Sequence, residues 1–496
     1  MTKVEISQEK ISSFLASDRK TIKGLEKENL RSDPEGKISN NPFPDAFGVH
    51  NFNSFVTLDY SEPHLELVTP PFESNSAALD FLSDLHGFVE NNLDGDLLWN
   101  YSMPPKFKSK YIKLPHHRNC NTTKLAHLYR LGLRNRYGDK MQSTAGIHFN
   151  FSLSESAITS LNESKTNIYL GMSRNLLRLF PIVLRLIGCS PVAHKSFMKG
   201  RKINIETMNE DDCCLPKSTS LRVSRLGYYS EEQDENFITF NSLKDYLSII
   251  RNYINKPNKK FQNISLDLKQ QVNNGTIQME SELYNHIRPK GVISRKVRPY
   301  NQLKENGIEY LELRSIDLNP YSTIGISLED IEFLELLCLY CVLSESPDIS
   351  LVESEVIKEN IRRSSESGQG CNFINSLESV PGEVDAKDMA ESFLNKLQAF
   401  SKEIGLHDDR KDMFDEYFKR NENPLSERLI EDIKKHGGVL DFILKQSKHT
   451  HRKIDNENLT IFQNEKEISE TEYEKHKKQD DIIFEEYLEN FRGAIR

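Results

Sequence analysis

The sequence predicts an α+β protein: a curved, mainly antiparallel sheet with a polar concave face, helices packed on the other face, and a helical C-terminal region. Two observations support this prediction. Several segments alternate apolar and polar residues with a period of two, which is typical of strands that bury one face. The last third of the chain lacks this alternation and is typical of increasingly charged helices. Because one face of such a sheet is apolar, we expect helices to cover it.

The N-terminal part is predicted to begin with a helix and to continue into short strands. Residues 1–20 have helical character, and residues 24–70 are rich in turn formers. Within that stretch, GLEKENLR is extended, so that its two glutamates share one face and the lysine between them points to the other. SFVTLDY and HLELV are also predicted strands. Helices follow over residues 76–93 and 124–140, and the strict alternation in GIHFNFSLS predicts a half-buried strand.

The middle of the chain is predicted to contain one apolar helix and three more strands. The helix covers residues 168–189, and we expect it to break at Pro181. SLRVSRLGYYS, GTIQMESELY and EYLELRSIDL each alternate in polarity, so each is predicted to be a strand. Residues 256–275 are polar and are expected to form a surface excursion.

The C-terminal part is predicted to be helical. Ser327 begins a strong helix, because Asp330 follows at the spacing of a capping box. Beyond about residue 345 the chain is helical, with RRSSESGQG as a loop. We therefore expect two units, a core at 1–345 and a helical region at 346–496 that packs on it.

Composition argues against several classes of protein. The chain has 496 residues, of which 37% are hydrophobic and 28% charged, the balance of a globular protein. Its net charge of −9 argues against a nucleic-acid partner, which would require a concentrated basic face. No segment has the length and apolarity of a membrane span, and the N-terminal residues do not resemble a secretory leader. The seven cysteines then fit the reducing cytoplasm, where we expect the protein to act.

The polar faces of the predicted strands are rich in acids. Two carboxylates about 6 Å apart repel by roughly 3 kcal/mol at an effective dielectric near 20. A converging group of acids therefore requires cations, and oxygen donors with an occasional imidazole suit Mg²⁺ or Mn²⁺. Arginines on the same face suit a phosphoryl group or a carboxylate. The candidate residues are Glu26, Glu28, Asp59, Glu62, Glu66, His148, Asn150, Arg222, Gln278, Glu280, Glu282, Glu312 and Arg314.

Competing interpretations stay open at this point. A single glutamate in an alternating strand is most often a solvated residue, and one sequence does not show that separate strands converge. No phosphate-binding loop of the form GxxxxGK[S/T] or GxGxxG occurs. A zinc site is disfavoured because Cys338 and Cys341 have no second pair at similar spacing. A serine nucleophile is disfavoured because Ser152 and Ser154 lack the nucleophile-elbow sequence.

Seven motifs, in order along the chain, resemble those of one enzyme family. They are GLEKENLR, DYSEPHLELVTPP, WNYSMP, LYRLGLRNRYGDKMQSTAGIHFNFSL, TSLRVSRLGY, ELYNHIRPK and GIEYLELRSIDLNPYSTIG. The chain resembles the glutamate–cysteine ligases (γ-glutamylcysteine synthetases) of proteobacterial type, whose fold is glutamine-synthetase-like. The resemblance implies ATP-dependent ligation of the L-glutamate γ-carboxylate to the L-cysteine amine through γ-glutamyl phosphate. The products are γ-glutamylcysteine, ADP and phosphate, in the first step of glutathione biosynthesis.

The resemblance also implies roles for individual residues on the concave face. Two or three Mg²⁺ or Mn²⁺ ions would bind at Glu26, Glu28, Asp59, Glu66, His148 and Glu312. Arg314 and Glu312 would be catalytic, with Arg314 at the transferring phosphate of the co-substrate ATP. The amino-acid substrates would contact Tyr129, Arg130, Leu133, Gln142, Asn150, Arg222, Tyr228 and Tyr284.

The resemblance leaves two alternative functions to be tested. A related carboxylate–amine ligase of the same fold would use another amine acceptor. A non-catalytic nucleotide- or metal-binding protein would bind Mg-ATP without turnover. In the main interpretation, residues 1–345 form the catalytic unit of a monomer that glutathione inhibits by feedback. No nucleic-acid or membrane partner is expected.

Overall fold

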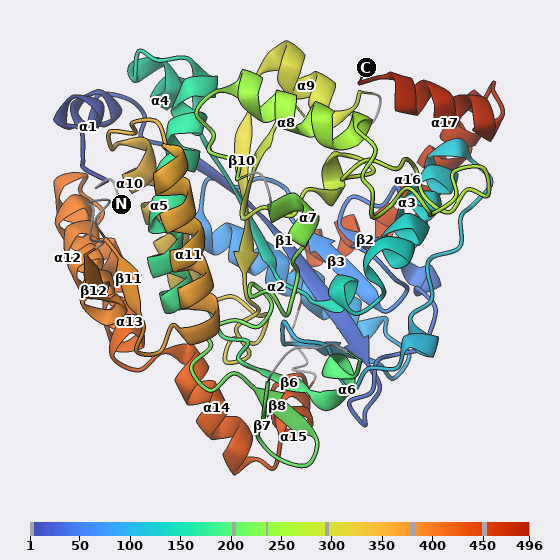
Figure 1. The fold of residues 1–496 in the computed structure, drawn as a ribbon, viewed down its shortest axis with the longest axis horizontal. Helices are drawn as coiled ribbons and strands as arrows, with labels where there is room; N and C mark the ends of the chain where they lie inside the picture. Colours follow the sequence, from blue (N-terminus) through green and yellow to red (C-terminus); the bar gives the residue numbers. More distant parts are fainter. Residues whose placement is uncertain are drawn as a thin grey trace.

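The computed structural model describes residues 4–200, 205–234, 237–292, 297–375, 382–448 and 454–495, and it confirms the α+β prediction (Figure 1). The strands of the main sheet are β1 (Thr21–Ser32), β2 (Val56–Leu58), β3 (His64–Val68), β4 (Leu97–Trp99), β5 (Ile147–Leu153), β9 (Ile287–Lys290) and β10 (Tyr310–Ile316). Their order is β2–β3–β1–β5–β10–β9, with β4 on the far end of β1. All of these pairings are antiparallel, so β1 and β5 form the middle of the sheet.

Ten helices of the described chain precede residue 345, and they match most of the helices expected there. They are α1 (Gln8–Leu15), α2 (Asn75–Asn91), α3 (Asn121–Tyr137), α4 (Glu155–Ser160), α5 (Lys165–Ile187), α6 (Lys195–Met198), α7 (Glu231–Asp234), α8 (Leu243–Asn255), α9 (Pro299–Asn306) and α10 (Leu328–Val342). Single 3₁₀ turns occur at Asp45–Phe47, Ser109–Tyr111, Met141–Ser143, Glu280–Glu282 and Asp408–Arg410. The capping box of Ser327 and Asp330 is present at the start of α10.

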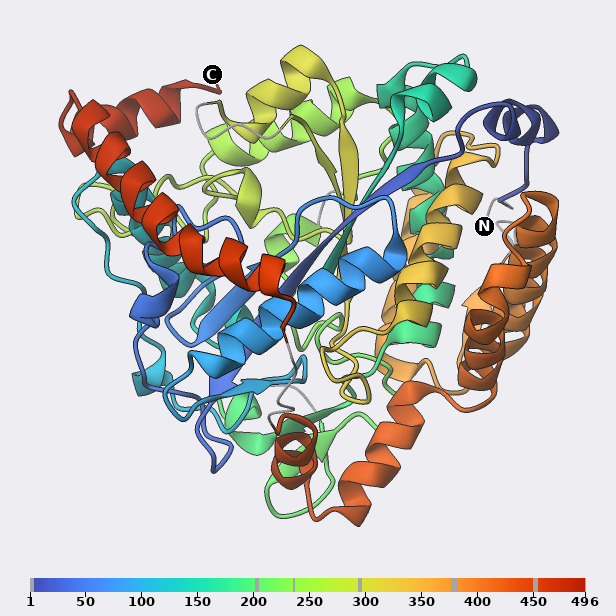
Figure 2. The ribbon, with the colours of Figure 1, turned by 180° about the vertical axis from the view of Figure 1, so that it is seen from behind.

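Helices cover one face of the sheet. Leu25, Phe149 and Leu311, from three adjacent strands, have no exposed surface. Contacts with the strands come from α2, α5 and α10, and in Figure 2, which views the molecule from behind, α2 crosses in front of the strands. Burial of this apolar face supplies the main driving force for the layer, and it leaves the opposite face available for polar side chains.

The lysine between the two glutamates of β1 faces these helices, as predicted. Lys27 is fully buried, and its Nζ lies 2.8 Å from Nδ1 of His86 on α2. Burial lowers the pKa of Lys27 to about 7. The alternation of β1 thus separates Lys27 from Glu26 and Glu28 by the thickness of the sheet.

Two of the predicted strands are absent. Residues 220–230 form turns, in which Tyr228 N donates to Arg222 O at 2.8 Å. A side chain at Gly227 would come within 2.1 Å of that same carbonyl oxygen, so only glycine fits this tight turn. Residues 275–284 contain a 3₁₀ turn instead of a strand. In residues 275–284 the alternation in polarity did not indicate a strand, because Glu280 and Glu282 belong to buried ion pairs with Arg298 and Arg136.

The helix at 168–189 is also different from the prediction. It is α5, which runs through Pro181 as one continuous helix. A proline removes one helical hydrogen bond, but α5 is buried between α10 and α11 (Leu351–Ser367), and this packing keeps the helix intact. The expected loop RRSSESGQG lies mostly in α11 and becomes irregular only at Gly368.

The C-terminal region is helical, as expected, and its helices pack on several parts of the core. Beyond α11 the described helices are α12 (Ala386–Glu403), α13 (Lys411–Glu422), α14 (Leu425–Lys435), α15 (Val439–Gln446), α16 (Asn456–Gln479) and α17 (Phe484–Gly493). α12 and α13 contact α5 and α10, α16 lies along α2, and α17 contacts α3 (Figures 1 and 2). No helix among the described residues is long and apolar enough to cross a membrane.

Two small sheets complete the fold. One consists of β6 (Val192–His194), β7 (Glu206–Thr207) and β8 (Asp212–Cys214), and the other of β11 (Asn372–Ile374) and β12 (Glu383–Asp385). Both lie outside the main sheet.

A buried ion pair joins α11 to α5, and its loss should destabilise the fold. Arg178 donates from Nε and Nη2 to the two carboxylate oxygens of Glu353, each at 3.0 Å, and both side chains are almost fully buried. Glu353→Ala leaves the guanidinium without its counter-charge, so the free energy of unfolding should fall by about 3–5 kcal/mol. Chemical denaturation measures this change. As a control, Glu355→Ala at the exposed neighbouring position should alter the free energy of unfolding by less than about 0.5 kcal/mol. Equal losses of stability in the two variants would contradict a stabilising role for the ion pair.

Candidate active site

Strand register places the acidic residues side by side on the face opposite the helices. Glu28 on β1 lies across from Glu66 on β3. Glu26 lies across from His148 on β5. Directly opposed residues share one face of a sheet, so the four side chains form a single polar row. The convergence that the sequence left open is therefore present.

His148 lies at the centre of this row. Its Nδ1 is 3.0 Å from Glu26 Oε2 and 3.5 Å from Glu312 Oε1 on β10. Its Nε2 is 3.3 Å from Glu28 Oε1. Burial and the charge of Arg314 lower the pKa of His148, but Glu28 and Glu26 outweigh them and raise it to about 9. The imidazole is thus surrounded by acids from both neighbouring strands.

Three of these residues fit a divalent cation. Glu26, Glu66 and His148 each offer a donor atom, and these atoms lie within 4.8 Å of one another. Burial, together with the charges of Glu26 and Asp59, raises the pKa of Glu66 to about 8, so its carboxyl keeps a proton unless a cation replaces it. Nε2 of His148 is buried, with Glu28 Oε1 at 3.3 Å. Carboxylate oxygens with one imidazole form a donor set that suits Mg²⁺ or Mn²⁺.

Glu28 and Asp59 extend the acidic row, but their surroundings differ. Burial raises the pKa of Glu28, yet His148 and Arg222 hold it below its ordinary value. Nη2 of Arg222 lies 3.6 Å from Glu28 Oε2. Burial raises the pKa of Asp59, whose Oδ2 is 3.4 Å from Nδ1 of His64. Both carboxylates therefore lie close enough to the row to join a larger cation site.

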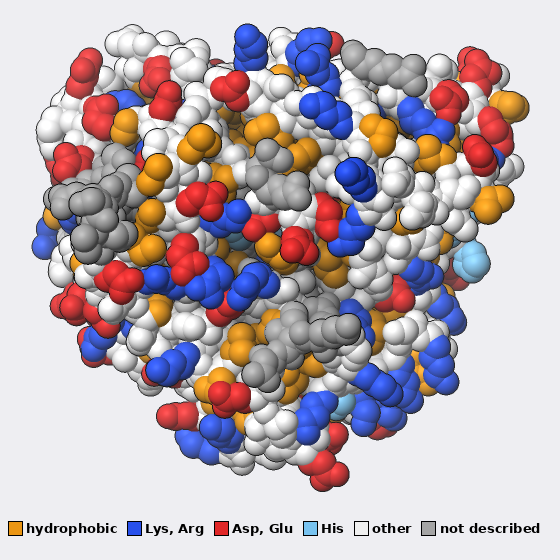
Figure 3. All heavy atoms as spheres, viewed as in Figure 1, with side chains coloured by type: hydrophobic (Ala, Val, Ile, Leu, Met, Phe, Trp, Pro, Cys, Tyr) orange, Lys and Arg blue, Asp and Glu red, His pale blue; other side chains and the backbone are white. Residues whose placement is uncertain are grey.

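Basic residues from β9 and β10 form the other end of the same face. The carboxylate of Glu312 has Arg314 Nη1 at 3.1 Å, Lys290 Nζ at 3.3 Å and Arg288 Nη1 at 3.7 Å. Burial raises the pKa of Glu312, but Lys290, Arg314 and Arg288 hold it well below its ordinary value. The sheet face is thus acidic on β1 and β3 and basic on β9 and β10. Around the middle of the molecular surface, acidic and basic side chains also occur close together (Figure 3).

Sequence reasoning missed Arg288 and Lys290. The signal was available, because both lie within ELYNHIRPK and alternate with Ile287 and Pro289 at the spacing of a strand. A strand of only four residues is too short to stand out by its pattern.

The tyrosines predicted near the substrate lie together. The rings of Tyr228 and Tyr284 are 4.5 Å apart in an edge-to-face arrangement. Nε2 of Gln142 donates to the hydroxyl of Tyr284 at 2.9 Å. Leu133 and Tyr129, on α3, belong to one apolar cluster. The structure thus brings together α3, the turn at 220–230 and the segment 283–286.

The three other residues predicted to contact the substrates are Asn150, Arg222 and Arg130. They differ in whether their side chains border the acidic row. Asn150 Nδ2 donates to Glu26 Oε1 at 2.8 Å, so Asn150 borders the acidic row. Arg222 borders it from the other side through its proximity to Glu28. Arg130 instead donates to the main-chain oxygens of residues 58 and 59, at 2.6 and 2.9 Å, and thereby fixes the end of β2 beside Asp59.

Three other residues that the sequence analysis placed with the acidic side chains do not lie in the acidic row. They are Glu280, Glu62 and Gln278. Glu280 pairs with Arg298 at 2.7 Å. Glu62 accepts from the main-chain N of Phe43 at 2.7 Å. Gln278 donates from Nε2 to the main-chain O of Tyr129. These side chains make local structural contacts. An alternating sequence pattern does not distinguish such side chains from those that share one face of a sheet.

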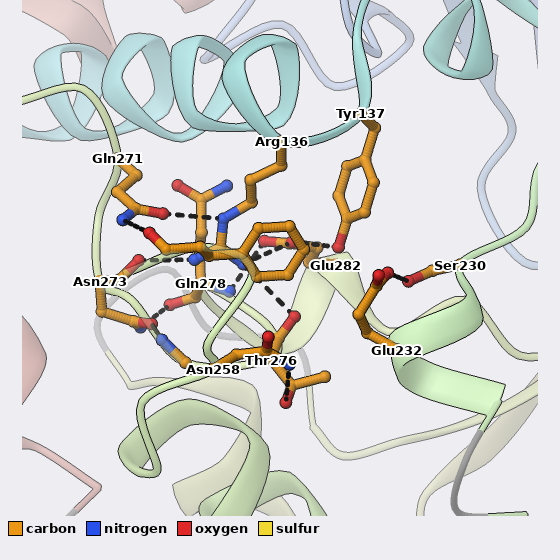
Figure 4. Close-up of polar contacts among 12 residues, drawn as sticks. Arg136, Tyr137, Ser230, Glu232, Asn258, Gln271, Asn273, Thr276, Gln278 and Glu282 are labelled. Carbon is orange, nitrogen blue, oxygen red and sulfur yellow. Dashed lines mark hydrogen bonds and ion pairs between the residues drawn. The ribbon is translucent and has the colours of Figure 1, made fainter. Parts of the chain in front are cut away.

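Glu282, also predicted in the row, is the centre of a buried network next to Tyr284 (Figure 4). Its Oε1 accepts from Arg136 Nη1 and from the Tyr137 hydroxyl, each at 2.9 Å. Its Oε2 accepts from the main-chain N of Gln278 at 2.8 Å. The side chains of Arg136 and Glu282 are completely buried. Because Glu282 is two residues from Tyr284, this network fixes the segment that carries the tyrosine to α3.

Comparisons with known proteins agree on one family. Residues 6–364 match the family model described as "Glutamate-cysteine ligase". The glutamate–cysteine ligase of Wigglesworthia glossinidia brevipalpis is 34% identical over 478 residues, which cover 92% of this chain and 94% of that protein. The glutamate–cysteine ligase of Proteus mirabilis is 32% identical over 504 residues, covering 95% and 94%.

Solved structures agree with the fold. The crystal structure of glutamate–cysteine ligase from Francisella tularensis, in complex with AMP, superposes with a TM-score of 0.90 and 25% identity. The superposition covers 96% of this chain and 98% of the Francisella chain. A bifunctional glutathione synthetase from Pasteurella multocida shares the fold, with a TM-score of 0.69, 23% identity and coverage of 88% of this chain and 53% of that one.

The fold and the charged sheet face, together with these matches, define the class of this protein as a ligase. Within that class, the chain belongs to the glutamate–cysteine ligase family.

The network around Glu282 can be tested by its effect on stability. Glu282→Ala leaves Arg136 buried without its counter-charge, so the free energy of unfolding should fall by about 3–5 kcal/mol. Replacing both partners, as Arg136→Met with Glu282→Leu, should recover part of this loss because no unpaired charge remains. Denaturant titration measures both changes, with the exposed Glu305→Ala as a control. A double variant less stable than Glu282→Ala would contradict this account.

Proposed function

We propose that this protein joins the L-glutamate γ-carboxylate to the L-cysteine amine with ATP, through γ-glutamyl phosphate, as the first step of glutathione biosynthesis. Family membership supports the overall reaction. The observation that best supports the mechanism is the division of one sheet face into an acidic and a basic end. A carboxylate is a poor electrophile, so its oxygen must first attack the γ-phosphate of ATP. Two anions then have to meet, which requires positive charge around both.

The acidic end would hold two or three Mg²⁺ or Mn²⁺ ions. Its proposed ligands are Glu26, Glu28, Asp59, Glu66 and His148, together with Glu312, which lies at the border with the basic end, 3.5 Å from His148. Bound ions would offset the negative charge of the phosphates and of the reacting carboxylate. Before they bind, the proton on Glu66 and the charge on His148 reduce the repulsion among the acids, as their raised pKa values indicate.

The basic end would stabilise the phosphoryl group during transfer. Arg314 is the proposed catalytic arginine, and Glu312 orients it through the contact at 3.1 Å. Arg288 and Lys290 lie on the same face, next to Glu312, and would contact other phosphate oxygens. Arginine suits this task because its planar fork binds two oxygens at once.

The acceptor amino acid would bind beside Tyr228 and Tyr284. Its amine attacks the acyl phosphate, an amide bond forms, and phosphate leaves with the bonding electron pair. The aromatic pair and Leu133 would help to exclude water, which otherwise hydrolyses the acyl phosphate. Asn150 would face the glutamate, next to Glu26, and Arg222 would contact a substrate anion. Tyr129, Arg130 and Gln142 would complete the pocket from α3 and the turn that follows it.

The biological setting proposed here rests on the family and on the sequence. The adenine nucleotide in the Francisella relative supports ATP as the co-substrate. We place the protein in the cytoplasm, as a monomer that glutathione inhibits by feedback, without a nucleic-acid or membrane partner. Residues 1–345 would carry the catalysis and 346–496 would support them, although the match to the family model continues to residue 364.

The choice of cysteine can be tested directly. With L-glutamate and Mg-ATP present, L-cysteine should stimulate ADP formation more than any other of the twenty amino acids, because the acyl phosphate turns over only when the amine is accepted. A coupled ADP assay measures the rates, and mass spectrometry identifies γ-glutamylcysteine. A stronger response to another amine would indicate a related carboxylate–amine ligase. Binding of Mg-ATP without turnover for any amine would indicate a binding protein and overturn the proposal.

The metal site can be tested by removing one charge at a time. Glu66→Gln should raise the Mg²⁺ concentration for half-maximal activity by about tenfold or more, because a neutral amide is a weaker ligand than a carboxylate. Glu28→Gln should act in the same direction. Glu62→Gln is the matched control, since Glu62 bonds to the main chain of residue 43 and does not join the acidic row. An unchanged Mg²⁺ titration for Glu66→Gln and Glu28→Gln would move both residues out of the metal site.

A further inference from the structure

Asn285 is a buried amide that makes no hydrogen bond. Both its Nδ2 and its Oδ1 are shielded from solvent and lack a partner. Buried side-chain amides in folded proteins almost always have at least one partner, because leaving both groups unpaired costs free energy. An amide with neither group satisfied therefore indicates something that binds there.

The backbone around Asn285 is fixed, so this side chain is held in place. The main-chain N of Tyr284 donates to Gln233 Oε1 at 2.8 Å. The main-chain O of His286 accepts from Arg314 N at 2.9 Å. The two neighbours are thus anchored to different elements, one to α7 and the other to β10.

Asn285 faces the proposed reaction centre. It lines a cavity of about 30 Å³ together with Arg222, Arg314, Tyr228 and Tyr284. These four are the residues assigned above to the phosphoryl group and the amino-acid substrates. Asn285 is the one neutral amide among the lining residues of this cavity.

Asn285 also lines a larger cavity. This cavity has a volume of about 370 Å³, and its walls include Phe237, Ile238 and Leu283. The smaller cavity holds no more than a water molecule, but the larger one has room for a free amino acid. Acidic and basic residues at its rim, such as Lys358 and Asp234, already pair with each other at 3.2 Å. Asn285 thus lines both cavities, and both polar atoms of its side chain lack a hydrogen-bond partner.

We propose that Asn285 binds the acceptor amino acid of the ligation. Its Nδ2 donates to the α-carboxylate and its Oδ1 accepts from the amine, while the nearby guanidinium of Arg222 or Arg314 supplies the positive charge. An amino acid carries an acceptor and a donor on the two sides of one carbon, which matches the two groups of an amide. This inference rests on the proposed ligase function, and it adds a specificity-determining residue to that reaction.

The experiment compares Asn285→Leu with the wild-type protein. Leucine has a similar size and no polar group, so the unligated protein should keep its melting temperature or gain slightly, because a buried unpaired amide has been removed. The KM for cysteine should rise by about tenfold or more, the loss expected for a hydrogen bond to a charged group. The KM values for glutamate and ATP should stay within about twofold of wild type. Asn395→Leu, on the exposed side of α12, is the control and should change none of these values.

Each other outcome contradicts the inference. An unchanged KM for cysteine in Asn285→Leu would show that the amide only holds a water molecule. A lower melting temperature with equal increases in all three KM values would show a structural role. If the wild-type protein forms no ADP with glutamate and any amine, the proposed function itself fails. Cysteine-dependent turnover in the wild type combined with an unchanged variant overturns the role of Asn285 alone.

Discussion

Repulsion among buried acids on one sheet face is the constraint on which the rest of the structure depends. Glu26, Glu28 and Glu66 come within reach of one another because β1 lies between β3 and β5. Such a group is stable only with positive charge or protons nearby. His148 supplies a charge at the centre, and Glu66 keeps a proton. The same imbalance would give the face its proposed affinity for cations, so the structural cost and the proposed function would share one cause.

The two faces of β1 show how the fold manages charge. Glu26 and Glu28 point to the polar face, whereas Lys27 points into the helical layer and meets His86 of α2. Lys23, on the same side of β1 as Lys27, pairs with Glu335 of α10 at 2.9 Å. A hydrogen bond and an ion pair thus tie the central strand to the helices behind it. These contacts help to hold β1 in the register that aligns the acidic row.

Rigidity around the proposed amino-acid pocket comes from outside the main sheet. Glu282 and Arg136 anchor the segment that carries Tyr284 to α3, and Gly227 permits the tight turn that carries Tyr228. Pocket residues on loops need such support, because loops alone hold side chains less firmly than strands do. In the proposed reaction, the strands would therefore carry the charged groups, and the anchored loops would shape the space for the acceptor.

The sequence by itself determined the α+β class, the main strands at β1, β5 and β10, and which acids of those strands share a face. Alternation with a period of two reflects which face of a strand is buried. These strands could therefore be predicted without knowing which strands pair with them. The alternation did not distinguish a strand from a turn whose polar residues form buried ion pairs, such as the pair of Glu282 with Arg136. It also missed Arg288 and Lys290 on the short strand β9. Which strands become neighbours, and which buried amide stays without a partner, were decided by the tertiary structure alone, because both depend on contacts between residues far apart in the chain.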